Sequence, residues 1–293
     1  MRFAVLGPGG VGGLMAALLA RAGDSVEVLA GESTAREIAG GGIRVESVRF
    51  GNFTAPVQAA AQLSEPVDAV MVTVKATQLE EAIKRVPPPA LGDAMVIPFL
   101  NGLDHVEVLR RAYPPDQVVP AAIRIESARP DPGSIRHTSH FAGIEIGPAA
   151  EQVAARLSAA GFDVRTRADE KLMLWEKFVF LAPMALLTTD ARANVGTVRT
   201  KRRKDLTALL REVSLVAGAD GVAIDPASIL RFIDAIPGSM ETSMQRDQAA
   251  GRPLELDALG GALLRRAEKA GINTPVTRRL VAEIGARSSI RSA

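Results

Sequence analysis

The sequence predicts an α/β protein with two domains, an N-terminal Rossmann-type doubly wound sheet and a C-terminal all-helical domain. A glycine-rich loop stands between an apolar strand and a helix within the first 13 residues. Strand and helix patterns then alternate, which indicates parallel pairing. Beyond about residue 167 only helical patterns remain. We therefore expect residues 1–167 to form a dinucleotide-binding domain and residues 168–293 a helical substrate and dimerisation domain.

The opening elements frame the glycine loop. Residues 2–6 predict a short buried strand, and residues 11–22 predict a helix that is apolar on a broad face and ends at Gly23. Between them residues 7–12 read Gly-Pro-Gly-Gly-Val-Gly, which is G-x-G-x-x-G in the setting where this motif binds a dinucleotide. An ordinary glycine-rich turn is the alternative.

Each position of the loop has an expected task. Gly7 permits a tight turn, Gly9 lets the backbone approach a pyrophosphate, and Gly12 lets the helix pack close to the strand. The pyrophosphate would lie on the helix N-terminus, where the N–H groups of Gly10 and Val11 and the helix dipole favour an anion.

Further elements of the first half alternate. We expect strands at 25–29, 43–49, 54–57, 67–74, 95–100, 117–125, 134–138, 144–146 and 163–166, and helices at 76–86, 103–112 and 149–160. A capping box over Thr34–Glu37 predicts one more short helix. Ligands of such sheets bind beyond the carboxyl ends of the strands, so we expect the active site in a cleft where the helical domain faces that edge.

The second half shows no strand pattern. We expect helices at 169–188, 203–219, 226–236, 239–250, 255–270 and 275–287.

Composition excludes several classes of function. The 293 residues include no cysteine, which excludes disulfides and thiolate metal sites. His137 and His140 lack an acidic residue spaced to complete a zinc site, so no metal is expected. No run of 18 apolar residues and no signal peptide is present, so we expect a cytoplasmic protein without a membrane span. The basic run 199–204 lacks flanking aromatic residues and predicts a solvated loop and helical turn, not a nucleic-acid site.

Candidate chemistry comes from polar residues at special positions. Lys75 and Asn101 each follow a buried strand, although such residues often only cap the next helix. Lys177 lies inside an apolar helix, where burial of the ammonium group lowers the pKa and suits a general acid near neutral pH. The alternative is a lysine whose charged end reaches solvent. Glu255 and Ser243 are unremarkable by position alone.

Taken together and in order, these pieces resemble the ketopantoate reductase family over essentially the whole chain. The shared motifs are residues 7–12, 74–78, 101–102, 175–177, 196–199, 243–244, 255–257 and 271–275.

The resemblance implies a reductase that transfers hydride from a nicotinamide cofactor to a 2-oxo acid, 2-dehydropantoate in the family, on the route to pantothenate and coenzyme A. It implies Lys177 as the general acid and Glu255 as the residue that orients substrate and pairs with the lysine. Asn101 would bridge cofactor and lysine, Lys75 would lie near the nicotinamide, and Ser243 would hold the substrate carboxylate.

Two departures from the family pattern concern the substrate and the cofactor. Leu181 and Ala185 stand where the family has substrate-binding asparagines, which points to a more apolar 2-oxo acid unless Thr188 or Thr189 compensates. Gly31 stands where the arginine for the 2′-phosphate of NADPH is expected.

Glu32 lies 20 residues after Gly12, where an acidic residue would accept the ribose hydroxyl of NAD. Arg36 could still serve a phosphate. The family favours NADPH and these residues favour NADH.

Three hypotheses follow. The chain is a ketopantoate reductase, a reductase of the same fold for another 2-oxo acid, or a nicotinamide-binding sensor without turnover. A small-molecule substrate is expected and a nucleic-acid or membrane partner is not. The apolar helices of the second half leave a homodimer open. A third, milder departure, Thr277 in place of an asparagine, carries no expectation.

Overall fold

The computed structural model describes residues 1–289 and divides into two compact units. The first unit contains Met1–Leu100 and His105–Met173, and the second contains Asn101–Asp104 and the chain from Leu174 onward. The four residues Asn101–Asp104 therefore belong to the second unit, although the chain on both sides of them belongs to the first.

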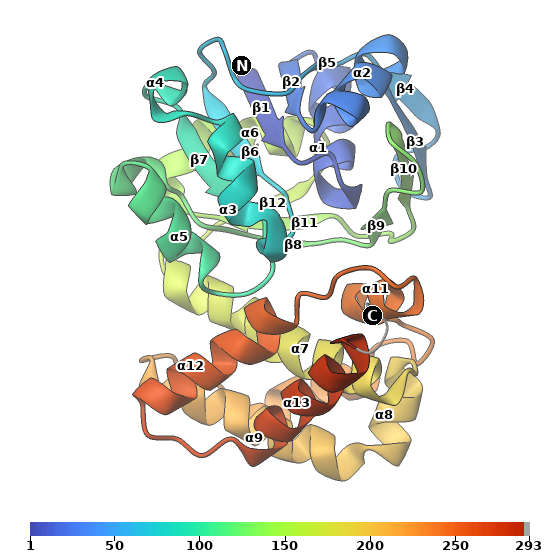
Figure 1. The fold of residues 1–293 in the computed structure, drawn as a ribbon, viewed down its shortest axis with the longest axis vertical. Helices are drawn as coiled ribbons and strands as arrows, with labels where there is room; N and C mark the ends of the chain where they lie inside the picture. Colours follow the sequence, from blue (N-terminus) through green and yellow to red (C-terminus); the bar gives the residue numbers. More distant parts are fainter. Residues whose placement is uncertain (290–293) are drawn as a thin grey trace. The chain divides into compact units, whose positions relative to one another are not determined.

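A parallel five-stranded sheet forms the centre of the first unit, in the order β5-β2-β1-β6-β7 (Figure 1). Its strands are β1 (Arg2–Leu6), β2 (Ser25–Leu29), β5 (Gln58–Ala60), β6 (Ala69–Val72) and β7 (Met95–Pro98). β1 lies between β2 and β6. The chain adds β2 and β5 on one side of β1 and then crosses to add β6 and β7 on the other side. The glycine loop follows the carboxyl end of this strand, as in a Rossmann-type sheet. The predicted fold class is confirmed.

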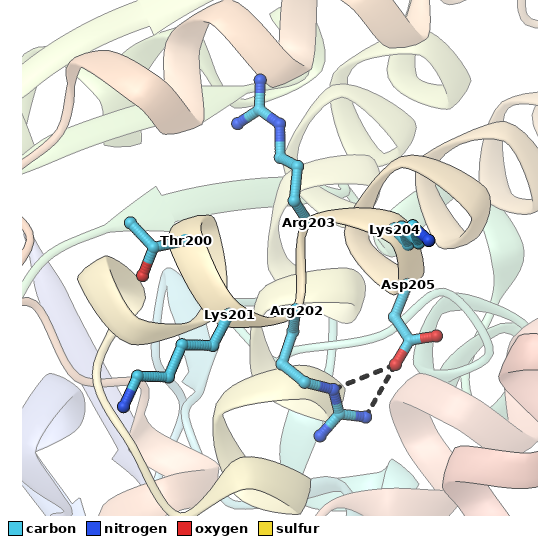
Figure 2. A pocket seen from close by; sticks show the side chains of 6 residues that line it. All are labelled: Thr200, Lys201, Arg202, Arg203, Lys204 and Asp205. Atoms are coloured by element: carbon cyan, nitrogen blue, oxygen red, sulfur yellow. Dashed lines mark hydrogen bonds and ion pairs between the residues drawn. The ribbon is translucent and has the colours of Figure 1, made fainter.

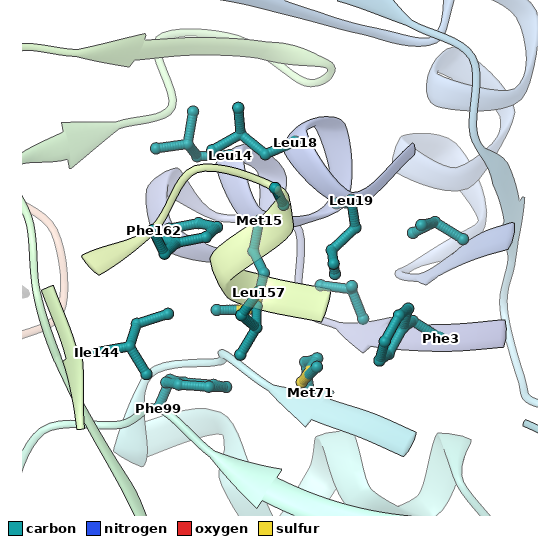
Figure 3. Close-up of a cluster of buried hydrophobic side chains, with 14 of the residues drawn as sticks. Phe3, Leu14, Met15, Leu18, Leu19, Met71, Phe99, Ile144, Leu157 and Phe162 are labelled. Atoms are coloured by element: carbon teal, nitrogen blue, oxygen red, sulfur yellow. The ribbon is translucent and has the colours of Figure 1, made fainter. Parts of the chain in front are cut away.

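Helix α1 (Gly10–Arg21) lies between this sheet and a second one. The second sheet has the order β4-β3-β10-β9, in which only β3 and β10 run parallel. Its strands are β3 (Ile43–Ser47), β4 (Phe53–Ala55), β9 (Ser127–Ala128) and β10 (Ser134–His137). Two-sided contact buries the helix from Gly12 to Leu19 and explains its apolar composition (Figure 3).

A third sheet and one helix complete the core of the first unit. Strands β8 (Ala121–Arg124), β11 (Gly143–Ile146) and β12 (Asp163–Thr166) pair in the order β12-β11-β8. Helix α6 (Glu151–Ala159) packs on β12 and contributes Leu157 to the same apolar cluster as Phe3 and Phe162 (Figure 3). Hydrophobic burial in this shared cluster is the main stabilising contribution to the unit.

Several local predictions for the first unit are wrong. Helix α2 (Glu32–Gly41) begins before the predicted capping box, because extended Gly31 is its N-cap and no side chain caps it. The predicted helix 76–86 is three short pieces, η1 (Ala76–Gln78), α3 (Leu79–Ala82) and η2 (Ile83–Arg85).

Strands β5 and β9 were not predicted. The remaining elements are α4 (Pro88–Leu91), α5 (His105–Ala112), η3 (Pro115–Gln117) and η4 (Pro148–Ala150).

The second unit is built around helix α9, which contacts α8, α10, α12 and α13. Its helices are α7 (Glu170–Ala191, which belongs to this unit from Leu174 onward), α8 (Val195–Lys201), α9 (Arg203–Ala219), α10 (Pro226–Ala235), α11 (Ser243–Ala249), η5 (Asp257–Gly261), α12 (Ala262–Lys269) and α13 (Pro275–Ser289). η5 is a π-helical turn that leads into α12.

Two predictions for this unit need correction. The helix expected at 239–250 covers only Ser243–Ala249, because Thr242 is its N-cap and accepts a hydrogen bond from the backbone of Gln245. The predicted list also lacked α8, which Asn194 caps by accepting from the backbone of Thr197.

Helix α7 is long and apolar enough to cross a membrane by length and composition alone. It has 22 residues, and 67% of its most apolar 18-residue window is buried inside the structure. The core helix of a globular unit has the same length, composition and burial.

Candidate active site

The glycine loop adopts the tight turn that its sequence predicts. Gly7 has a φ of +93°, a conformation that costs glycine little. A Cβ atom at Gly7 would lie 2.4 Å from Cγ1 of Val74. The Gly7 amide donates to the carbonyl of Leu29 at 3.0 Å, and the Gly9 amide donates to the carbonyl of Gly7 at 2.8 Å. These bonds fix the loop between β1 and α1.

Thr73, which directly follows β6, holds the glycine loop in place by hydrogen bonds. Its hydroxyl donates to the carbonyls of Leu6 at 3.0 Å and Gly7 at 2.8 Å. A Cβ at Gly12 would lie 2.2 Å from the Thr73 hydroxyl and 2.4 Å from the Gly7 carbonyl oxygen, so Gly12 permits the close packing of α1. Thr73 was not predicted, because a hydroxyl residue near the end of an apolar strand is a weak signal.

The side of the loop at Gly9 is open. A Cβ atom there would meet no heavy atom within 4 Å, whereas one at Gly10 would lie 2.4 Å from the carbonyl oxygen of Ser127. The first N–H groups of α1, including those of Gly10 and Val11, have no partner inside the helix because they begin it. Open space beside unpaired helix N–H groups fits the pyrophosphate of a dinucleotide, so the residues present suit this cofactor.

The carboxyl end of β2 carries groups of both charges. Glu32 is the first residue of α2 and is exposed. Arg85 also reaches this strand end, where its Nη1 donates to the carbonyls of Ala30 at 3.0 Å and Ala61 at 2.8 Å. Arg85 could not be predicted from the sequence, because its contacts depend on how η2 packs near the ends of β2 and β5. Arg36 is exposed on α2.

Asn101 and Glu255 are joined directly in the second unit. Nδ2 of Asn101 donates to Oε2 of Glu255 at 3.1 Å. Glu255 is only 6% exposed, so its carboxylate depends on protein hydrogen bonds instead of water. These residues are 154 positions apart in the chain. Glu255 lies two residues before Asp257, the first residue of the π-helical turn η5, and such turns are often found at functional sites.

Lys177, Leu181 and Ala185 follow each other at intervals of four residues on α7. Lys177 and Leu181 are half-buried, and Ala185 is 1% exposed. Thr188 is buried close to this stripe, and its hydroxyl donates to the carbonyl of Met184 at 2.7 Å and lies 2.8 Å from the hydroxyl of Thr242. Thr188 is therefore held by protein contacts, and Thr189 is fully buried.

The remaining predicted residues occupy helix starts. Ser243 is the first residue of α11 and is exposed. Lys75 is half-buried in the first unit as the N-cap residue of η1, without a side-chain capping bond. Lys75 therefore has the N-cap position of its helix-capping alternative but not the capping bond, and Ser243 follows the N-cap residue Thr242.

The basic run in the second unit is part of an ion-pair network. Arg202 pairs with Asp205 and Asp190, each at 2.8 Å, while Arg203 points the opposite way and pairs with Asp234 at 2.5 Å (Figure 2). Arg199 donates to the last carbonyls of α10. These contacts favour a structural role for the run.

Comparison with known proteins shows similarity along most of the chain. A family model described as ketopantoate reductase PanE/ApbA matches residues 3–151, and its C-terminal counterpart matches residues 169–288. A 2-dehydropantoate 2-reductase of Mycobacterium tuberculosis is 32% identical over 294 residues, which cover 97% of each chain.

Two solved structures share the fold across the full length of both chains. A PanE/ApbA family ketopantoate reductase from Ralstonia eutropha JMP134 has a TM-score of 0.91 at 27% identity. A D-mandelate dehydrogenase, solved with NADH and anilino(oxo)acetate, has a TM-score of 0.93 at 20% identity.

Proposed function

This chain belongs to the ketopantoate reductase family, and on that premise we propose that it reduces 2-dehydropantoate to pantoate with NAD(P)H, a step toward pantothenate and coenzyme A. The observation that carries the proposal is the hydrogen bond between Asn101 and Glu255. It brings a strand-end asparagine to the buried carboxylate expected to orient substrate. A nicotinamide cofactor and a 2-oxo acid are the coarser features common to the family.

The proposed chemistry divides among a few side chains. A reduced nicotinamide supplies hydride to the keto carbon when it is bound. Lys177 donates the proton to the oxygen that becomes the alcohol, and its positive charge stabilises the developing alkoxide. Glu255 accepts a hydrogen bond from a substrate hydroxyl and pairs with the lysine. The Ser243 hydroxyl donates to the substrate carboxylate.

Cofactor preference depends on the end of β2. We propose NADPH as the cofactor, following the family, with NADH as the alternative. Glu32 favours NADH, because a carboxylate accepts a ribose hydroxyl and repels a 2′-phosphate. Arg85 supports NADPH, because it adds a cation beside Ala30 where Gly31 supplies none. Lys75 is proposed to lie near the nicotinamide and Asn101 to bridge it to Lys177.

A reductase for a more apolar 2-oxo acid is the second candidate. Leu181 and Ala185 offer no hydrogen bond at the positions where the family has asparagines, and Thr188 is held by Met184 and Thr242. Each polar substrate group left without a partner would cost about 1–3 kcal/mol of binding. A D-mandelate dehydrogenase shares this fold, which supports an apolar substrate on the same scaffold.

A steady-state assay decides between these candidates. The protein is assayed with 2-dehydropantoate and with a panel of apolar 2-oxo acids, each with NADPH and with NADH. Highest kcat/KM on 2-dehydropantoate supports the first proposal, and highest kcat/KM on an apolar acid supports the second. Lys177→Ala should lower kcat by at least about 100-fold if the lysine is the general acid. No turnover despite cofactor binding would favour the sensor hypothesis.

We further propose that residues 1–167 bind the cofactor and that residues 168–293 bind substrate and form a homodimer, in a cytoplasmic enzyme. Sedimentation velocity at two protein concentrations tests the homodimer.

A further inference from the structure

The segment Asn101–Asp104 contacts the chain around η5 at successive positions. Asn101 donates to Glu255, just before η5. Gly102 comes next, with a φ of +93°, and a Cβ atom there would lie 2.6 Å from the carbonyl oxygen of Ala258. A side chain at this position would therefore separate the segment from η5. Backbone contact at Gly102 and side-chain contact at Asn101 together define the register of the segment on η5.

Asp104 forms the third contact, farther along the same helix. Its Oδ2 accepts from Nη2 of Arg265 at 2.7 Å, and its Oδ1 accepts from Nη1 of Arg266. Arg265 also donates to Asp257 at 2.7 Å, and Asp257 is the first residue of η5. Burial opposes the charged form of Asp104, but the two guanidinium groups hold its pKa below the usual value. The carboxylate is therefore charged and bridges both arginines at neutral pH.

This arrangement differs from an isolated surface ion pair, which stabilises little. Two arginines on α12 hold one carboxylate, and one of them also holds the start of η5. The Asp104 side chain is 34% exposed and that of Arg266 22%, so the contact is partly shielded from solvent. The same network thus fixes both sides of the Asn101–Glu255 hydrogen bond, the segment that carries Asn101 and the turn that follows Glu255.

We propose that Asp104 is a positioning residue for the reduction: its bridge to Arg265 and Arg266 keeps Asn101 in register with Glu255. The inference rests on the proposed function of that pair. Asp104 touches neither substrate nor cofactor in this role. Its loss is expected to lower kcat through misplacement of Asn101, and to change KM less, because the groups that bind substrate remain present.

The chain offers a matched control in Asp205. Its carboxylate also bridges two arginines of the second unit, Arg202 at 2.8 Å and Arg279 at 3.0 Å, and its side chain is 29% exposed. Asp104→Asn and Asp205→Asn therefore remove the same charge from similar surroundings. Only the first removes it beside Asn101. Asp104→Glu retains the charge and tests rescue.

Two readouts are measured on the full-length protein. Amide hydrogen exchange by mass spectrometry follows the peptide covering residues 99–105, without need of substrate. Steady-state kinetics use the 2-oxo acid on which the unsubstituted protein has the highest kcat/KM. Asp104→Asn should speed exchange in that peptide and lower kcat about tenfold, with KM changed less than about threefold. Asp104→Glu should recover most of the rate, and Asp205→Asn should change neither readout.

The outcomes separate this inference from the proposed function. Unchanged exchange at residues 99–105 in Asp104→Asn overturns the inference, and so does a kcat equal to that of Asp205→Asn. Equal loss of kcat in Asp104→Asn and Asp104→Glu also counts against it, since only the charge is argued to matter. If the unsubstituted protein reduces no 2-oxo acid, the reductase proposal fails, and the exchange comparison still decides whether Asp104 holds the segment.

Discussion

Exchanging Gly9 or Gly12 for alanine should separate cofactor binding from packing in the glycine loop. The two glycines are three residues apart, and both have a backbone conformation that alanine can adopt: Gly9 is extended at φ −75° and ψ −166°, and Gly12 lies inside α1. Their surroundings are opposite. A Cβ at Gly9 meets nothing within 4 Å, whereas a Cβ at Gly12 would be 2.2 Å from the Thr73 hydroxyl.

The structure gives different expected costs for the two substitutions. At Gly12 the contacts with Thr73 and with the Gly7 carbonyl are roughly 1 Å too short, and overpacking of this kind costs about 1–3 kcal/mol. A loss of about 2 kcal/mol would lower the Tm by roughly 4–8 °C for a unit of this size. At Gly9 the fold should be unaffected, or stabilised by up to about 1 kcal/mol through the unfolded chain.

Cofactor affinity should fall in Gly9→Ala, although the stability of the fold should not. Its methyl group would occupy the space proposed for the pyrophosphate, so we expect the Kd for NADPH and for NADH to rise at least about tenfold, or 1.4 kcal/mol. Nucleotide fluorescence titrations and thermal melts of the three proteins measure both effects. A folded Gly9→Ala protein that binds both nucleotides as tightly as the parent would refute this assignment of the loop. A Gly12→Ala protein with the parent Tm would refute the packing argument.

Three further predictions concern stability and register. Burial lowers the pKa of His137, so the folded state resists its protonation, and the free energy of unfolding should fall as pH drops below about 6.5. Urea unfolding at pH 7.5 and 5.5 should show this loss in the parent and less of it in His137→Gln. Thr277→Val removes a 2.6 Å bond from the Thr277 hydroxyl to Glu212 and should cost about 1–3 kcal/mol in urea unfolding, with kcat unchanged. Gly102→Ala should lower kcat, because its Cβ would push the segment away from Ala258; an unchanged kcat would contradict the close contact.

The fold class could be predicted because its signals are local and repeated. The strand–loop–helix pattern over residues 2–21 and the long periodic helix at 203–219 appear in the structure almost as expected. The short strands β5 and β9 could not be found in the same way. β5 has three residues and β9 has two, which is too few to show a periodic pattern. β5 pairs with β2 along its backbone, and its sequence Gln-Ala-Ala has no apolar pattern of a strand.

Sequence periodicity also could not predict which strands pair with each other in the smaller sheets. β3 pairs parallel with β10, about 90 residues later in the chain, while its other neighbour β4 follows it directly and runs antiparallel. A strand pattern predicts an element but not its partner. The contact of these strands with α1 is nevertheless visible in the sequence of α1. Its apolar face is broader than a helix that is covered on one side only requires.

The candidate site shows the same limit at the level of single residues. Resemblance to a family predicted Asn101 and Glu255 as members of one site, with each expected to interact with cofactor, lysine or substrate. The structure adds the direct bond between them and places Asn101 in the second unit. Thr73, Arg85 and Asp104 were missed, because each acts through contacts with backbone or with residues far along the chain, and no spacing rule connects them.

If the proposed function is correct, substrate choice depends on the residues of α7 that follow Lys177 at intervals of four, Leu181 and Ala185. A site that hydrogen-bonds a substrate hydroxyl rejects analogues without it strongly, because its own polar groups would be left unpaired, whereas an apolar site rejects an added hydroxyl only weakly. Leu181 and Ala185 are apolar, and the buried Thr188 hydroxyl bonds to Met184 and Thr242. Under the proposed function, Leu181 and Ala185 offer little discrimination between substrates, while Lys177 supplies the general acid. We therefore expect a relaxed preference among 2-oxo acids, with turnover of each one lost on substitution of Lys177. Ala185→Asn with Leu181→Asn should then raise the kcat/KM ratio of 2-dehydropantoate to apolar acids.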